Sequence, residues 1–215
     1  VSVIDEVLKV SSVYLGETHG TNEIPVLVGC LVDAAIQKHK APLVVSIELP
    51  LSAGDPASRI WSGTDGRSSE AMWRLVDHLK SLQLKSLLTL DFQLGESATV
   101  YEAGERAVGL RLKQLSESNY VIALGGLLHS QRKQVLIPEL ESTPAGFYTG
   151  EKIRSVLVDA AKPGTAWICK ATCGVTNIRP ILSGVQAQEL SPDSTSGFDY
   201  VLKLPSLTAS EPKLR

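Results

Sequence analysis

The sequence predicts an α/β fold with a central, mostly parallel sheet of βα units, helices on both faces and a C-terminal antiparallel hairpin. Up to residue 130, short apolar runs alternate with longer amphipathic segments, which is typical of βα units. Residues 43–47 form a continuous apolar run between Pro42 and Pro50, as expected of a strand buried on both faces. After residue 150, strand-like runs follow each other without long helical segments. These three observations define the fold class.

Each predicted element follows from its local pattern. Apolar runs predict four successive parallel strands, at 13–16, 43–47, 87–90 and 120–124. Helical spacing of apolar residues, with capping residues before it, predicts three helices, from 21 or 22 to 39, from 68 or 69 to 79, and over 99–116. Residues 51–67 are rich in Ser, Gly, Asp and Pro and predict a long surface loop. Such loops are often functional.

The C-terminal part is predicted to complete a single domain over residues 1–204. Residues 155–158 and 166–169 flank a Lys-Pro-Gly turn at 162–164, which predicts a hairpin. Residues 200–204 predict a further strand. Residues 205–215 carry Pro, Ser and charge with few apolar side chains, so we expect a surface tail.

The composition excludes several classes of protein. The 215 residues include 43% hydrophobic ones, enough for a sizeable core. With 21 Lys and Arg against 23 Asp and Glu there is no basic stripe, so we expect no nucleic-acid partner. The apolar runs are far shorter than the roughly 20 residues of a membrane span. The chain starts with Val1 rather than Met, which indicates that a tag or signal segment was removed, and we favour a periplasmic or membrane-anchored lipoprotein over a cytoplasmic protein.

Two of the three cysteines lie close together. Cys169 and Cys173 would be about 13 Å apart on an extended strand, so a disulfide requires a turn at residues 170–172. The alternative, half of a zinc site, lacks a second pair at a familiar spacing. Ordinary or disulfide-bonded cysteines are therefore the preferred interpretation. Cys30 falls within a helical pattern.

Titratable residues follow every predicted parallel strand. Because the carboxyl ends of parallel strands meet at one edge of a sheet, we expect these side chains to line one cleft there. We expect the side chains of Glu17, His19, Glu48 and His129 to lie within roughly 10 Å of one another, the scale of a small-ligand pocket. The residues at the strand ends are Glu17, His19, Glu48, His129 and Asp91. Both histidines close a Gly-x-x-His pattern, at 16–19 and 126–129.

Histidines flanked by carboxylates suit two kinds of chemistry. A carboxylate on one ring nitrogen fixes the tautomer, so that the other nitrogen can take a proton from water. Alternatively, imidazole and carboxylate together bind a divalent metal that acidifies water. Glu23, at a helix start four residues after His19, is either a further carboxylate of this site or a helix cap. The sequence has no Gly-x-Ser-x-Gly elbow or phosphate-binding loop.

Residues 15–25, Leu-Gly-Glu-Thr-His-Gly-Thr-Asn-Glu-Ile-Pro, resemble the Gly-Glu-x-His-Gly opening of the erythromycin esterase/ChaN-like superfamily, which includes the Tiki and TraB proteins. The resemblance covers about residues 12–204 and points to the bacterial ChaN-like branch. The further similar stretches are 46–50, 65–72, Glu105-Arg106, 124–130 and 167–174. Residues 126–130 lack the Asn and the final Ala of the family's Gly-Asn-x-His-Ala stretch.

The resemblance implies either a hydrolase or a haem-binding protein. Erythromycin esterases open a lactone with a His-activated water, Tiki proteins are metal-dependent peptidases, and ChaN resembles a haem-binding lipoprotein. Our leading expectation is an ester, lactone or amide hydrolase of a small-molecule or peptide substrate. His19 would be its general base, tuned by Glu17 and Glu48, with His129 near the substrate. Asp91 and Arg106 would help to bind the substrate.

Two cofactors are expected as alternatives. A divalent Mn, Co or Zn ion would be held by His19, His129 and Glu48. Noncovalent haem would replace hydrolysis altogether, with Tyr148 as its phenolate ligand.

Overall fold

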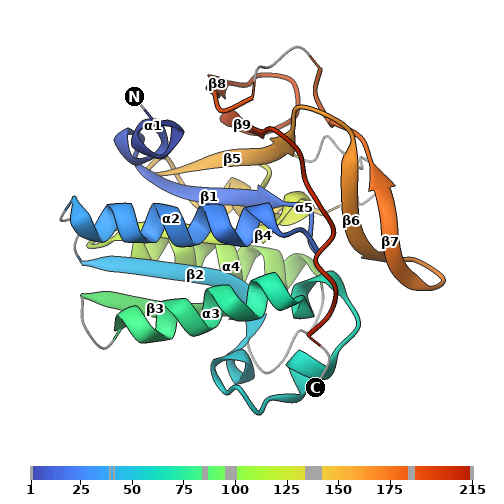
Figure 1. Cartoon of the computed structure of the whole chain (residues 1–215). Helices are drawn as coiled ribbons and strands as arrows, with labels where there is room; N and C mark the ends of the chain where they lie inside the picture. The colour runs from blue at the N-terminus through green and yellow to red at the C-terminus, as the bar shows by residue number, and fades with distance from the viewer. Residues whose placement is uncertain are drawn as a thin grey trace.

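A seven-stranded sheet forms the centre of the computed structural model, which describes residues 2–38, 40, 42–83, 87–94, 101–133, 142–183 and 187–213. Its strand order is β3-β2-β4-β1-β5-β9-β8, and all neighbours are parallel except the β8–β9 pair (Figure 1). The predicted α/β class with a mostly parallel sheet is therefore confirmed.

The elements have the following bounds. The strands are β1 (Ser12–Glu17), β2 (Leu43–Pro50), β3 (Leu88–Leu94), β4 (Tyr120–Gly126), β5 (Ile153–Ala160), β6 (Gly164–Cys169), β7 (Cys173–Ile178), β8 (Leu190–Pro192) and β9 (Tyr200–Leu204). The helices are α1 (Val3–Lys9), α2 (Glu23–Gln37), α3 (Glu70–Gln83), α4 (Tyr101–Leu115), α5 (Leu127–Ser130) and α6 (Ala145–Tyr148). Three 3₁₀ turns follow β2: η1 (Leu51–Gly54) and η2 (Arg59–Ser62) lie in the loop predicted at 51–67, and η3 (Gly66–Ser68) begins in it and ends one residue beyond.

Helices cover both faces of the sheet, and alternate strand residues pack on each side. Val13 and Leu15 of β1 pack in one apolar cluster with residues of α1, α2 and α3, whereas Tyr14 packs in another with residues of α4 and α6. Figure 1 shows α2 and α3 in front of the strands and α4 behind them. Burial on both faces explains why these strands are apolar without alternation. No helix of the described part is long and apolar enough to cross a membrane.

The strands extend further than their apolar runs suggested. β2 continues to Pro50 and β3 to Leu94, so Asp91 lies inside a strand rather than after one. Polar residues are tolerated there because buried hydrogen-bond partners satisfy them. The helix expected over 99–116 is α4, while residues 95–100 lie outside the described ones. The helix expected to reach residue 39 is α2, and residue 39 is likewise outside them.

The predicted pairing of residues 155–158 with 166–169 is wrong. The first segment belongs to β5, which lies parallel to β1 and β9 in the main sheet. The second belongs to β6, which pairs antiparallel with β7 as a separate two-stranded sheet. The apolar pattern marked both strands correctly, but β5 is buried inside the domain whereas β6 is only partly buried. Burial of β5 on both faces made it a sheet strand.

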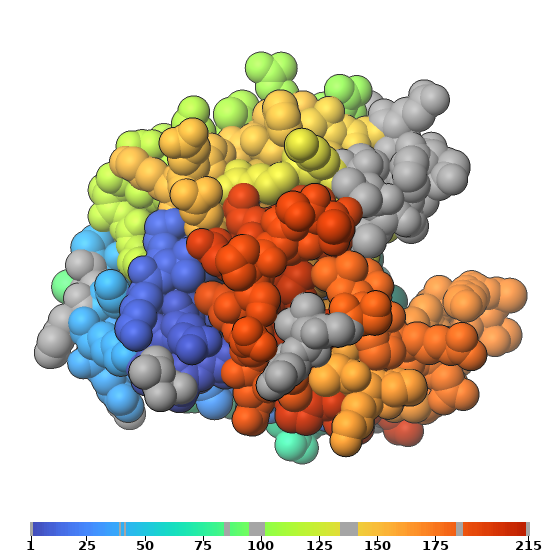
Figure 2. All heavy atoms as spheres, turned by 90° about the horizontal axis from the view of Figure 1, so that it is seen from above, coloured from blue at the N-terminus to red at the C-terminus, as the bar shows by residue number. Residues whose placement is uncertain are grey.

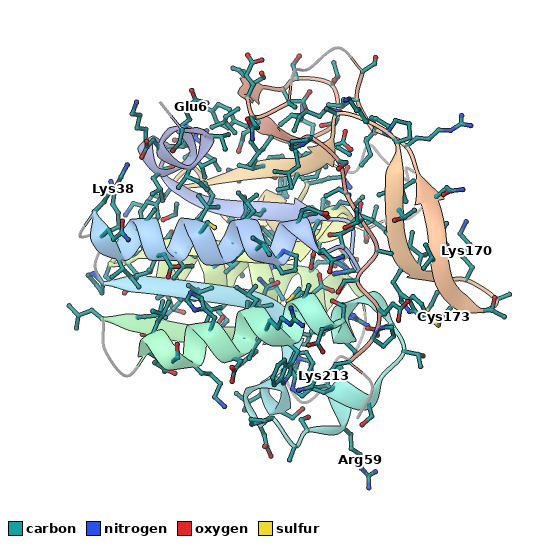
Figure 3. All side chains as sticks on the ribbon, in the orientation of Figure 1. Glu6, Lys38, Arg59, Lys170, Cys173 and Lys213 are labelled. Carbon is teal, nitrogen blue, oxygen red and sulfur yellow. A yellow bond between two sulfur atoms is a disulfide. The ribbon has the colours of Figure 1, made fainter. Side chains whose placement is uncertain are left out.

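A disulfide joins the two ends of the β6–β7 turn. Cys169 and Cys173 are bonded and also face each other in the strand register. The turn that the spacing required is thus the hairpin turn itself. Figure 3 places Cys173 at the end of the hairpin, and Cys30 is an exposed free thiol on α2.

The segment expected to be a surface tail is firmly attached to the domain. Leu207 is 1% exposed, and Thr165 donates a backbone hydrogen bond to its carbonyl oxygen. Two isolated bridges pair Thr21 with Ala209 and Ser69 with Pro212. The Lys213 ammonium lies over the Trp73 ring, 2.8 Å from its centroid, beside α3 (Figure 3). Leu207 and Pro212 are the buried apolar residues that attach this segment.

Replacing Leu207 should therefore cost as much as a core substitution. We expect Leu207→Ala to lower the free energy of unfolding by about 2–5 kcal/mol, because it leaves a cavity in a packed site. Leu87→Ala is the matched control, since Leu87 is 73% exposed and should change stability by less than about 0.5 kcal/mol. Urea unfolding measures both. Equal effects of the two variants would contradict the structural role of the segment.

Candidate functional site

Three parallel strands deliver polar groups to one edge of the sheet. β1 ends at Glu17, which is in register with Gly126 at the end of β4. The pairing of β2 with β4 ends at Ile47 and Leu124, and Glu48 is the next residue of β2. Figure 2 shows the β6–β7 hairpin, in orange, projecting from the rest of the molecule. This edge of the sheet therefore brings the carboxylates of Glu17 and Glu48 close to the end of β4.

His19 follows β1 and is held between two of these carboxylates. Its Nδ1 atom donates to Glu17 Oε1 at 3.0 Å, and its Nε2 atom lies 3.9 Å from Glu48 Oε1. The Glu17 side chain is 2% exposed, whereas the His19 side chain is 29% exposed. A buried carboxylate therefore orients an imidazole that water can reach.

His129 forms a second imidazole–carboxylate pair on the other side of Glu48. It lies in α5, directly after β4, and its Nδ1 atom donates to Glu105 of α4. The other oxygen of Glu105 accepts the backbone N–H of Ala145 at 2.7 Å, which fixes the carboxylate. The Nε2 atom of His129 lies 3.7 Å from Glu48 Oε1. Both imidazoles thus direct Nε2 toward one oxygen atom.

Glu48 is the centre of the cluster. Its side chain is 7% exposed, and Oε2 accepts the backbone N–H of Gly126 at 2.6 Å. Oε1 accepts from the Arg67 guanidinium at 3.4 Å. A Cβ atom at Gly126 would lie 2.9 Å from His19 Nε2, so only glycine allows this close approach. The glycine of the second Gly-x-x-His pattern therefore has a steric reason.

The charges of the cluster stabilise one another. Burial alone disfavours an imidazolium at His19, but Glu17 and Glu48 outweigh it and raise the pKa of His19. Burial likewise opposes the charge of His129, and Glu105 and Glu48 more than compensate, so that its pKa is raised. Burial would raise the pKa of Glu48, but the two imidazoles, the Gly126 N–H and Arg67 lower it.

Arg67 comes from the loop between β2 and α3. It follows Asp65, which accepts the backbone N–H of Arg67 at 2.9 Å and its guanidinium at 3.3 Å. The hairpin holds this loop in place, since Trp167 Nε1 donates to the Thr64 carbonyl at 2.8 Å and Cys169 Sγ lies 3.2 Å from the same oxygen. The disulfide end of the hairpin therefore supports the loop that carries the guanidinium.

Two predicted site residues, Glu23 and Asp91, have other partners. Glu23 accepts from the backbone N–H of Thr208 at 2.8 Å and from its hydroxyl, so it anchors the C-terminal segment. Asp91 accepts from the Ser46 hydroxyl at 2.8 Å and from Arg111 on α4. These two carboxylates are therefore bonded within the fold.

Arg106 and Tyr148 also lie apart from the four clustered side chains. Arg106 is exposed on α4, and neighbouring helix residues point about 100° apart, so it does not share the direction of Glu105. Tyr148 of α6 packs edge-on against Phe147, with ring centroids 5.2 Å apart, and its Cβ approaches Gly109 of α4. Both residues therefore lie outside the cluster.

Sequence reasoning missed Arg67 and Glu105 as site residues. Arg67 lies in the loop between β2 and α3 and Glu105 lies on α4, so neither follows a parallel strand. Of the Glu105-Arg106 pair, the sequence-based expectation placed Arg106, not Glu105, at the substrate. The heptad position of Glu105, with Leu112 seven residues later and buried against the sheet, is the signal that favours the glutamate.

The clustered residues do not fit a resident metal ion. Two imidazoles and a carboxylate are a suitable donor set in chemical terms. However, Glu48 is already bonded through both oxygens, and the Arg67 guanidinium lies beside it. Among the described residues no three His, Cys, Asp or Glu side chains are grouped closely enough to hold a cation. No chemical step is therefore assigned to a metal.

Comparison with solved structures finds the same fold in two proteins. A Bacillus cereus protein matches with a TM-score of 0.62 and 10% sequence identity, over 99% of this chain and 94% of that one. The type III effector HopBA1 matches with a TM-score of 0.55 and 13% identity, over 94% of this chain and 93% of that one. No family model matches the sequence, and a search of curated proteins gives no match. The likeness establishes the fold alone.

Removing the central carboxylate should change the titration of both histidines. We expect Glu48→Gln to lower the pKa of His19 and of His129, because Glu48 raises both. Two-dimensional NMR of the imidazole nitrogens measures this. Glu23→Gln is the matched control and should leave both values unchanged, because Glu23 bonds Thr208. Unchanged pKa values of His19 and His129 in Glu48→Gln would contradict the interaction of Glu48 with both imidazoles.

The same cluster should make stability depend on pH within a defined window. The raised histidine pKa values stabilise the fold below the ordinary value of 6.5, and this contribution is lost as pH rises through the raised values. The lowered pKa of Glu48 stabilises the fold above pH 4.5, the ordinary value for glutamate. This contribution is lost as pH falls through the lowered pKa. Unfolding of wild type and Glu48→Gln should therefore differ most between pH 4.5 and 6.5. A difference that does not vary with pH would refute this coupling.

Proposed function

We propose that this protein hydrolyses an ester, lactone or amide bond of a small-molecule or peptide substrate, with water as the nucleophile. One observation carries the proposal. Two imidazoles, each bonded through Nδ1 to a buried glutamate, direct Nε2 toward the same oxygen of Glu48. A base and an acid on either side of one anchored carboxylate are the groups that hydrolysis by activated water requires.

His19 acts as the general base. The Nδ1–H bond to Glu17 leaves the lone pair of the neutral ring on Nε2, and Glu17 stabilises the imidazolium that forms. Water attacks the carbonyl carbon as Nε2 takes its proton. The partial exposure of His19 gives water access to that nitrogen.

His129 and Arg67 act on the carbonyl side of the reaction. Arg67 is 36% exposed and donates to the negative charge that develops on the carbonyl oxygen. His129, whose pKa Glu105 and Glu48 raise against the effect of burial, gives a proton to the leaving alcohol or amine. Glu48 holds Arg67 and the two imidazoles in place. The haem-binding alternative gains no support from Tyr148, which packs against Phe147 on α6.

The test is a screen of ester, lactone and peptide substrates with three variants. We expect His19→Gln and His129→Gln each to lower kcat/KM by about 10²- to 10⁴-fold, the usual contribution of acid–base catalysis. His78→Gln is the matched control and should keep full activity, because His78 of α3 bonds Asp33 of α2 and no residue of the cluster. Chelation by EDTA should leave the rate unchanged. Loss of activity with EDTA, or retention in both site variants, would refute the proposed mechanism.

The pH dependence of this activity provides a second test. His19 must be neutral and His129 protonated, so kcat/KM should follow a bell-shaped curve whose limbs both lie above pH 6.5. In Glu48→Gln both limbs should move to lower pH, because Glu48 raises both pKa values. A profile that rises steadily without an upper limb would assign His129 a role other than proton donation.

A further inference from the structure

Gln93 of β3 forms an unusual set of contacts beneath the candidate site. Its side chain is buried, with 7% of the residue exposed. The amide nitrogen donates to two backbone carbonyls, of Ser46 and Leu124, each at 3.2 Å. The amide oxygen accepts from the Tyr14 hydroxyl at 3.3 Å. One side chain of β3 therefore bonds to β2, β4 and β1.

These three bonds meet the strands just before their functional ends. Ser46 precedes Glu48 by two residues, Leu124 precedes Gly126 by two, and Tyr14 precedes Glu17 by three. The pairing of β2 with β3 becomes irregular between Ile47 and Pro50, and the regular pairing of β2 with β4 ends at Ile47. The side-chain amide thus ties the strands together at the place where the backbone ladder becomes irregular.

The chemistry of an amide makes Gln93 hard to replace. Both N–H donors and the oxygen are used, so a reversed amide would place its oxygen against two carbonyl oxygens. An apolar side chain would leave the same two carbonyls and the Tyr14 hydroxyl without this partner. A carboxylate would offer no donor in its ionised form. Only glutamine provides two donors and an acceptor at this reach.

The three hydrogen bonds of Gln93 fix the distance between Glu48 and the C-terminal end of β4. Glu48 Oε2 is bonded to the Gly126 N–H at 2.6 Å, and the His129 imidazole follows Gly126 by three residues. A shift of β2 against β4 would change this bond and both gaps between Glu48 and the imidazoles. We therefore propose that Gln93 is a positioning residue, which fixes the exits of β1, β2 and β4 so that Glu48 stays between His19 and His129. Its catalytic meaning rests on the proposed hydrolase function.

The experiment measures the imidazoles directly, so that it works without a known substrate. Gln93→Met keeps the length and the approximate volume of the side chain but removes all three hydrogen bonds. Ser46→Ala is the matched control, because it removes one buried hydrogen bond, to Asp91, from the same strands but keeps the Ser46 carbonyl. Imidazole titrations are recorded by NMR for the wild type and both variants.

We expect Gln93→Met to move the pKa of His19 and of His129 toward 6.5, because both imidazoles lose contact with Glu48, while Ser46→Ala leaves them unchanged. Gln93→Asn, which keeps the amide but shortens its reach, should move them in the same direction. Unchanged titrations in Gln93→Met and Gln93→Asn would overturn the proposal. Failure of both variants to fold would overturn it as well, since the tie would then serve the whole sheet.

Activity, once a substrate is found, separates this proposal from the proposed function. Gln93→Met should lower kcat by about 10-fold or more with little change in KM, because a misplacement of about 1 Å costs up to about 10²-fold in rate. Shifted imidazole titrations in a protein that hydrolyses none of the screened substrates would support the positioning role and count against the hydrolase. Shifted titrations with full hydrolytic activity would overturn the catalytic meaning of the tie.

Discussion

The buried carboxylate of Glu48 is the constraint on which the site depends. An anion that is 7% exposed is costly unless charged and hydrogen-bonding groups surround it. Here the Gly126 N–H and Arg67 bond it directly, and two imidazoles approach it from either side. These neighbours come from β4, the loop before α3, the loop after β1, and α5. One negative charge therefore holds together segments that are far apart in the sequence.

The C-terminal part of the chain secures the loops that surround this charge. The carbonyl oxygen of Gly20, next to His19, accepts the backbone N–H groups of both Trp167 and Ser210. A Cβ atom at Gly66, next to Arg67, would lie 2.7 Å from the Gly20 nitrogen, so the two loops are in direct backbone contact. The disulfide hairpin and the terminal segment thus serve as a frame for the histidine and arginine loops, although neither contributes a residue to the cluster.

Much of the cluster could be predicted from sequence because a parallel sheet brings the ends of its strands together. Glu17, His19, Glu48 and His129 follow apolar strands, and parallel strands send their ends to one edge. Arg67 and Glu105 could not be found in this way, since a loop and the face of a helix bring them in. Glu23 and Asp91 look equally catalytic in sequence. Only the bonds to Thr208 and to Ser46 and Arg111 show that they stabilise the fold.

The sequence by itself determined the α/β class, the order of the βα units and the four polar residues at the strand ends. These depend on local patterns of apolar residues, which short segments carry on their own. The tertiary structure decided the partner of β6, the attachment of residues 205–213, the disulfide, and which charges face Glu48. Those outcomes depend on contacts between distant segments, and such contacts are selected by burial and by paired charges that no local pattern encodes.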